Sequence, residues 1–161
     1  MSQNPEDLLQ KAHDTYNSGD YQTAIKLYTQ FLGTKPEDDD YANASYWLAD
    51  SYFQLGDTTN ARHYYEISAK KDPENVDSWN GLGITYYDEG DYNRAEEYYQ
   101  KAYKINPKLH YVVYNLSLLE RARDKKDKEE KLLKECLEID PSYSDALNAL
   151  GNIYYGREDY K

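Results

Sequence analysis

Four types of residue recur along the chain in a common phase. Prolines are spaced by 37, 34 and 34 residues, at Pro36, Pro73, Pro107 and Pro141. A glycine, an alanine and a tyrosine repeat with the same first two intervals, starting from Gly19, Ala24 and Tyr28. Such self-similarity at a fixed period is typical of a repeat architecture. The chain is therefore predicted to be an array of units, each about 34 residues long.

Each unit has the pattern of two helices. Between residues 77 and 87, Trp79, Leu82, Gly83 and Tyr86 follow the spacing of one helical face. Gly90 interrupts this pattern, and Asp91 is suited to cap a second helix that ends before Asn106-Pro107. A unit is therefore predicted to be a helical hairpin.

The third unit resembles the tetratricopeptide repeat family. Eight positions match the signature of that family in order and spacing: Trp79, Leu82, Gly83, Tyr86, Ala95, Tyr99, Ala102 and Pro107. The resemblance implies an all-α fold, an α-solenoid of tandem hairpins that forms a right-handed superhelix with a concave groove. We expect one domain over residues 1–161, with units at 5–38, 42–75, 76–109 and 110–143 and the first helix of a fifth at 144–161. Residues 39–41 are then an insertion.

Two parts of the array depart from the pattern. In the fourth unit, Glu120 replaces a buried aromatic residue and Glu129 a close-packed alanine. The charged run between them, residues 121–131, is interpreted as a solvated turn before a slightly shifted helix; the alternatives are a flexible joint or a docking site for an acidic partner. The run of acids at residues 37–40 is interpreted as a solvated loop that helps to start the next helix.

The fifth unit lacks its second helix, so an apolar face of its first helix is expected to be uncovered. The residues expected on this face are Ala146, Leu147, Leu150 and Ile153. We expect the natural protein to continue past Lys161; the alternative is that another chain covers this face through self-association.

Composition narrows the class of function. The formal net charge of -11 argues against nucleic acid as a partner and favours a basic one. The chain has 20 tyrosines, which supply large rings with a polar end. The N-terminal sequence has no secretory signal and the chain no apolar run of membrane-spanning length, so we expect a cytoplasmic protein without membrane insertion.

No motif indicates catalysis, a cofactor or a metal. The histidines, His13, His63 and His110, lack the spacing of metal ligands, and there is no phosphate-binding glycine loop. Cys136 occupies a position that normally takes a small buried residue, so it is interpreted as a core thiol. We therefore expect a protein that is not an enzyme.

The resemblance implies that the first helix of each unit lines the concave groove. The residues predicted to contact a bound peptide are Tyr16, Asn43, Tyr46, Asp50, Phe53, Asp77, Asn80, Tyr87, Asp88, Tyr111, Tyr114, Arg121, Asn148, Asn152 and Tyr155. Tyrosine, asparagine and carboxylate side chains suit a peptide or helix that is basic or amphipathic. The alternative for any single tyrosine is packing between neighbouring units.

Two functional hypotheses follow. The first is a scaffold or adaptor that binds a peptide or helix of another protein in the groove. The second is a structural module that self-associates through its repeat ends; residues 38–57 resemble units of bacterial envelope-assembly proteins, which makes a periplasmic location the alternative to the cytoplasm. Co-chaperone members of the family grip acidic C-termini with Lys, Asn and Arg residues. The corresponding positions here are Leu9, His13, Trp47, Asp77 and Gly81, so we expect no such clamp.

Overall fold

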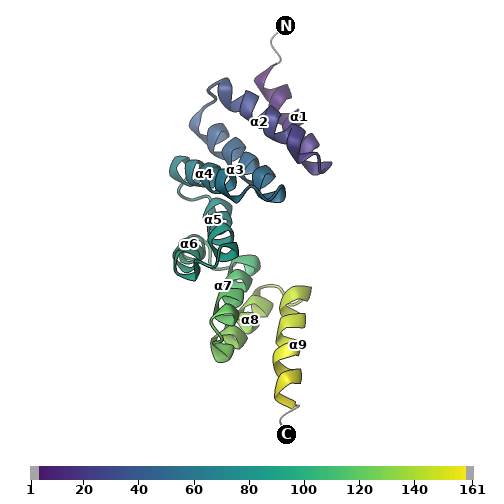
Figure 1. The fold of residues 1–161 in the computed structure, drawn as a ribbon, viewed down its shortest axis with the longest axis vertical. Helices are drawn as coiled ribbons and strands as arrows, with labels where there is room; N and C mark the ends of the chain where they lie inside the picture. The colour runs from purple at the N-terminus through teal and green to yellow at the C-terminus, as the bar shows by residue number, and fades with distance from the viewer. Residues whose placement is uncertain (1–3, 159–161) are drawn as a thin grey trace. The chain divides into compact units, whose positions relative to one another are not determined.

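The structure is a computed structural model that describes residues 4–158 (Figure 1). Within this range the chain forms nine helices and no strand. The helices are α1 (Pro5–Asn17), α2 (Tyr21–Gly33), α3 (Asp38–Gln54), α4 (Thr58–Lys71), α5 (Val76–Asp88), α6 (Tyr92–Ile105), α7 (His110–Ala122), α8 (Lys126–Ile139) and α9 (Ser144–Glu158). The prediction of an all-α solenoid of tandem hairpins is confirmed.

The chain divides into two compact units, Met1–Thr85 (unit 1) and Tyr86–Lys161 (unit 2), with the boundary inside α5. In unit 1, α1 packs against α2 and α3 against α4, and α2 also contacts α3 (Figure 1). In unit 2, α7 packs against α8, which also contacts α9, and α6 contacts α7.

A recurring Gly-Asp pair makes the turn inside three of the hairpins. The glycines adopt positive φ angles of 82°, 78° and 78° at Gly19, Gly56 and Gly90, a conformation that disfavours residues with a Cβ. The aspartate that follows each glycine caps the next helix: its carboxylate accepts a hydrogen bond of 3.1 Å from the backbone N–H of Thr23, Asn60 or Arg94. The periodic glycines therefore end one helix, and the aspartates begin the next.

The periodic tyrosines and alanines lie in the core. Tyr28, Tyr65 and Tyr99 are each no more than 3% exposed, and the alanines four residues before them are fully buried. Each tyrosine thus shares a face of its helix with an alanine, because residues four positions apart lie one turn away on the same side. The spacing of these tyrosines and alanines along the sequence therefore reflects a buried helix face that is repeated in each hairpin.

The acidic run at residues 37–40 is not a loop. Glu37 is the N-cap residue of α3, and Asp38, Asp39 and Asp40 form the first turn of this 17-residue helix. Negative side chains are favourable there because the helix dipole is positive at its N-terminus. The predicted insertion therefore lengthens α3 at its start.

Helix α9 covers one end of the unit 2 core. Ala146 and Ala149 pack in a cluster with Val113, Leu133 and Cys136. The expectation that Ala146 would be uncovered is thus wrong, since it is fully buried. Cys136 is buried, as predicted, and its thiol donates to the carbonyl of His110 at 3.2 Å.

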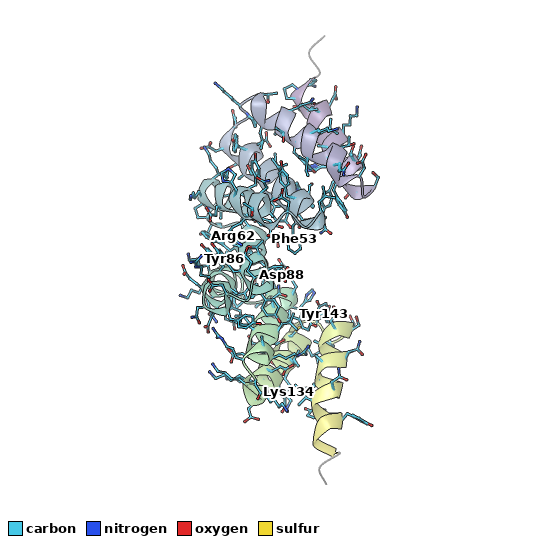
Figure 2. The ribbon with its side chains drawn as sticks, in the orientation of Figure 1. Phe53, Arg62, Tyr86, Asp88, Lys134 and Tyr143 are labelled. Carbon is cyan, nitrogen blue, oxygen red and sulfur yellow. The ribbon has the colours of Figure 1, made fainter. Side chains whose placement is uncertain are left out.

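The opposite face of α9 is open. Leu147 is 48% exposed and Tyr154 is 41% exposed, whereas Leu150 and Ile153 are half-buried. Figure 2 shows Lys134 of α8 and Tyr143 beside this helix, and the Lys134 ammonium lies 5.9 Å from the centre of the Tyr154 ring. Among the described residues, none of the helices has the length and apolar character needed to span a bilayer.

Candidate functional site

Asp50 of α3 is the centre of a polar cluster in unit 1. Its two carboxylate oxygens accept hydrogen bonds from different tyrosines: Oδ2 from the Tyr16 hydroxyl of α1, and Oδ1 from the Tyr65 hydroxyl of α4 at 2.9 Å. Gln54, one turn further along α3, donates to Oδ2 at 3.3 Å. Three helices thus converge on this carboxylate.

Aromatic rings surround the carboxylate. The Trp47 ring makes edge-on contacts with His13, Tyr16 and Tyr46, at centroid distances of 5.5, 4.9 and 5.1 Å. Tyr46 also lies 5.8 Å from Tyr65. We call Tyr16, Tyr46, Trp47, Asp50 and Tyr65 the Asp50 face. Tyr16 and Tyr46 therefore pack against neighbouring helices as well as lying at predicted contact positions.

Tyr16 and Tyr65 of this face are held in their protonated form. Burial, followed by the charge of Asp50, raises the pKa of Tyr65 above its usual range. Burial and the hydrogen bond to Asp50 do the same for the pKa of Tyr16. Both hydroxyls therefore remain donors to Asp50 at neutral pH.

Tyr65 is seated against a glycine that periodicity did not single out. A Cβ added at Gly81 of α5 would lie 2.6 Å from Cζ of the Tyr65 ring, closer than real Cβ contacts. Sequence reasoning missed the contributions of Tyr65, Trp47 and Gly81 to this face. The recurrence of tyrosine at position 65 indicated a core residue but gave no sign that its hydroxyl reaches Asp50.

A pocket of about 610 Å³ lies beside the Asp50 face in unit 1. Its walls include Leu9, His13 and Phe31, and its acidic residues are Glu6, Glu37 and Asp40, so we call it the acidic pocket. No lysine or arginine is among its described lining residues. The pocket and the Asp50 face share a neighbour, because the His13 ring also contacts Trp47.

His13 does not neutralise the acidic pocket near pH 7. Burial lowers the pKa of His13, an effect that the neighbouring Asp14 charge opposes. An imidazole with a lowered pKa is uncharged at neutral pH, since the usual value is already about 6.5. The charge in this part of unit 1 is therefore negative.

The remaining residues predicted in unit 1 differ in burial. Asn43 and Asp77 are exposed, and Phe53, labelled in Figure 2, is half-buried. Asn80 is buried, with 8% of its surface exposed. Of the residues predicted in unit 1, the structure brings Tyr16, Tyr46 and Asp50 together in one cluster.

In unit 2, the paired tyrosines face different environments. Tyr86 is 6% exposed and stacks on Tyr98 of α6, with ring centres 5.4 Å apart, so it lies between the two helices. Tyr87 is half-buried, and its ring lies 5.5 Å from Tyr92. Consecutive helical residues point about 100° apart, which accounts for the difference. Desolvation of the carboxyl also raises the pKa of Asp88, the predicted contact residue that follows Tyr87.

A second aromatic group surrounds Tyr114. Its ring is edge-on to Tyr143 at 5.2 Å, and Tyr143 lies 4.7 Å from His110. Burial, followed by the charge of Asp145, raises the pKa of Tyr143 to about 12. Tyr111 also contacts His110, at 5.7 Å. The predicted residues Tyr111 and Tyr114 thus belong to one ring cluster that bridges α7 and the start of α9.

The charged run at residues 121–131 forms an ordered ion network. Arg123 is the C-cap residue of α7, and its guanidinium bonds Glu96 at 2.8 Å, the Tyr92 carbonyl at 3.2 Å and Glu120 at 3.5 Å. The side chain of Arg123 is only 16% exposed. The two unusual glutamates are therefore paired, because Glu129 also accepts from Arg121 at 2.5 Å.

The interpretation of this run as a solvated turn is confirmed at Asp124 and Lys125, which are exposed between α7 and α8, but the expected shift of the following helix is wrong. Helix α8 begins at Lys126, which is 34 residues after the first residue of α6, so the repeat register is kept. Glu129 is 4% exposed at the position that normally takes alanine. A buried charge of this kind requires a partner, which Arg121 supplies.

A further pocket, of about 660 Å³, lies among α7, α8 and α9. We call it the Arg121 pocket; it is lined by Arg121, Lys126, Glu129, Ala149, Asn152, Ile153 and Gly156. The predicted contact residues Arg121 and Asn152 meet here. Asn148 and Tyr155, also predicted, are exposed on α9 but do not line this pocket.

The architecture defines a helical-repeat protein, and the comparisons identify its family. The model of the tetratricopeptide repeat matches residues 9–64 and 46–110. The chain belongs to the tetratricopeptide repeat family. Members of this family are generally non-catalytic interaction modules. None of the curated proteins matches the sequence.

Solved structures agree with this fold at low sequence identity. PilF of Pseudomonas aeruginosa superposes with a TM-score of 0.84 at 18% identity, covering 97% of this chain and 70% of its own. TTC0263 of Thermus thermophilus, a thermophilic repeat protein, gives 0.77 at 21% identity, covering 96% and 83%. The first repeat domain of Spaghetti (RPAP3), bound to the HSP90 peptide SRMEEVD, gives 0.69 at 20% identity, covering 74% and 95%. At sequence identities this low, the matches establish similarity of fold and nothing about function.

Proposed function

We propose that this chain is a non-catalytic scaffold that binds a basic or amphipathic peptide segment of another protein on the Asp50 face and in the acidic pocket of unit 1. The observation that supports this most strongly is the Asp50 carboxylate. It is half-buried among aromatic rings and has no cationic partner among the side chains that the structure describes, those of residues 4–156. A lysine or arginine side chain of a peptide supplies that missing cation.

Both parts of the surface suit the same ligand. The rings of Tyr16, Tyr46 and Trp47 offer faces for a cation and flat area for a peptide backbone. The adjoining acidic pocket combines apolar walls with three carboxylates, which matches an apolar residue flanked by basic ones. A related fold with a bound peptide, that of Spaghetti (RPAP3), supports the use of such a scaffold for peptides.

The test is calorimetric titration with two blocked synthetic peptides of equal length, one of alternating lysine and leucine and one of alternating glutamate and leucine. We expect only the lysine peptide to bind, and more weakly as salt rises, because charge attraction is screened beyond about 8 Å at physiological ionic strength. Asp50→Asn should raise the dissociation constant about tenfold, the effect of losing one charged hydrogen-bonding partner.

Glu74→Gln is the matched control. Glu74 is exposed in the α4–α5 connection of unit 1, outside both surfaces, and its replacement removes the same single charge. Its effect on the dissociation constant should stay below about twofold. Equal effects of the two substitutions, or equal binding of the two peptides, would contradict the proposal.

The open face of α9 favours a second candidate function, self-association. Leu147 and Tyr154 expose large apolar surface there, and Tyr155 next to them is 69% exposed. We expect the mass in solution to rise with concentration and Leu147→Lys to lower it. A mass equal to that of one chain at all concentrations would exclude this function and leave the peptide-binding proposal unaffected.

A further inference from the structure

The Arg121 pocket of unit 2 has the opposite charge preference from unit 1. Its charged residues are two cations, Arg121 and Lys126, and one carboxylate, Glu129. The carboxylate is already used, because Glu129 is 4% exposed and accepts from Nε of Arg121 at 2.5 Å. One positive charge is therefore left over, in a chain whose formal net charge is -11.

Glu129 fixes the direction of the Arg121 guanidinium. A guanidinium is planar and presents its donors in a rigid fork, so a bond at Nε determines where the two η nitrogens point. Within the described part of the chain, neither η nitrogen of Arg121 has a hydrogen-bond partner. Arg121 thus has donors available for a ligand, and the side chain is 45% exposed.

Other groups of the pocket add to this preference. The ammonium of Lys126 and the amide of Asn152 lie on exposed residues, and no described residue bonds either side chain. Ala149, which is 4% exposed, and the half-buried Ile153 form an apolar part of the lining. Donors on one side and methyl groups on the other suit a carboxylate carried on a short aliphatic stem.

We propose that the Arg121 pocket binds a glutamate side chain of a partner protein, with the carboxylate at Arg121 and Lys126 and the methylenes against Ala149 and Ile153. The pocket opens to solvent and lies among three helices, so a peptide passes across it without a chain end. This site is separate from the Asp50 face, and its existence does not depend on peptide binding there.

The test is an NMR titration of the whole chain with N-acetyl-glutamate-N-methylamide, and with the glutamine analogue as the neutral probe, at constant ionic strength. Probe concentrations up to about 50 mM detect dissociation constants in the tens of millimolar. We expect the glutamate probe alone to shift the backbone amide signals of Ala149, Asn152, Ile153 and Gly156.

Two lysine variants isolate the charge contribution. Lys126→Gln should raise the dissociation constant of the glutamate probe at least threefold, because it removes a cation that lines the pocket. Lys128→Gln is the matched control: Lys128 is exposed two residues further along α8 and lies outside the pocket. Its effect should be smaller than that of Lys126→Gln by about threefold or more.

A third variant tests the role of the planar donor arrangement of the Arg121 guanidinium. Arg121→Lys keeps a positive charge opposite Glu129 but loses the planar donors, so it should weaken the glutamate probe while the amide spectrum elsewhere in unit 2 stays unchanged. The proposal is overturned by equal shifts from both probes, by shifts spread over the surface, by equal effects of the two lysine variants, or by no shift at the highest concentration. Asp50→Asn should leave this titration unchanged, so failure here and failure of the unit 1 proposal are separate results.

Discussion

Replacing Gly81 with alanine tests whether the Tyr65 ring is held as tightly as the structure shows. In an ordinary helix interior this substitution stabilises by about 1 kcal/mol, because glycine has the greater backbone entropy in the unfolded chain. Here the new Cβ would lie 2.6, 2.7 and 2.9 Å from three carbons of the Tyr65 ring. The ring has little room to retreat, since Tyr65 is 3% exposed and its hydroxyl bonds Asp50 at 2.9 Å.

The expected effect is the sum of two costs less one gain. Overpacking a closed core costs about 1–3 kcal/mol, and displacing a hydroxyl from a carboxylate costs about 1.5–3 kcal/mol. After the gain in helix propensity of about 1 kcal/mol is subtracted, Gly81→Ala should lower the free energy of unfolding by roughly 1.5–5 kcal/mol. Urea unfolding followed by circular dichroism measures this quantity.

Two controls test whether the loss of stability in Gly81→Ala comes from the contact with the Tyr65 ring. Gly151 of α9 has open space around an added Cβ, so Gly151→Ala should raise the free energy of unfolding by up to about 1 kcal/mol. In a Tyr65→Leu background the ring is absent, and Gly81→Ala should then cost far less than it does beside tyrosine. Stabilisation by Gly81→Ala in the unmodified chain would refute the close seating of Tyr65 and, with it, the fixed geometry of the Asp50 face.

Three other predictions concern unit 2. Tyr86→Ala should lower the free energy of unfolding by about 3–5 kcal/mol by leaving a cavity, and Tyr87→Ala by about 1–2 kcal/mol; equal losses in urea unfolding would contradict the different environments of the pair. Folding raises the pKa of Tyr143 to about 12, so its contribution to stability should be complete below about pH 10 and should be lost as the pH rises from there through the folded-state pKa. The urea concentration at the unfolding midpoint should therefore fall above about pH 10, and Tyr143→Phe should make this fall smaller. Burial raises the pKa of Cys136 to about 11, so its thiol should resist alkylation at neutral pH until urea unfolds unit 2; rapid labelling of the folded chain would show that the thiol is accessible.

The fold was predictable because its determinants are local and periodic. Gly-Asp pairs, alanines and tyrosines recur at intervals of 37 and then 34 residues, and each acts within one turn or one hairpin. Asp50, Tyr16 and Tyr46 were predicted as contact residues because the resemblance to the tetratricopeptide repeat family implies that the first helix of each unit lines a groove. The contact of Tyr65 with Asp50 was not, because it joins α3 to α4 through a hydroxyl whose direction periodicity does not specify.

The fourth hairpin shows the limit of such reasoning more clearly. The replacement of core residues by Glu120 and Glu129 was visible in the sequence and was interpreted as a local departure from the pattern. Arg123 pairs with Glu120 and Arg121 pairs with Glu129, and Arg123 also bonds groups 27 to 31 residues earlier in α6. The single sequence showed that these charges are out of place, but not that Arg123 also joins Glu120 to α6 through Glu96 and the Tyr92 carbonyl.

The Arg123 network has a consequence for the order of the repeats. In many repeat proteins, units with similar apolar seams can be exchanged or multiplied, because every junction between neighbours is equivalent. Here the guanidinium of Arg123 makes its full set of hydrogen bonds only beside a helix that offers Glu96 and the Tyr92 carbonyl. Moving the α7–α8 hairpin to another place in the array would leave Glu120 buried without that support. The contacts of Arg123 therefore make the α7–α8 hairpin specific for the helix that precedes it, so this hairpin is not interchangeable with the others.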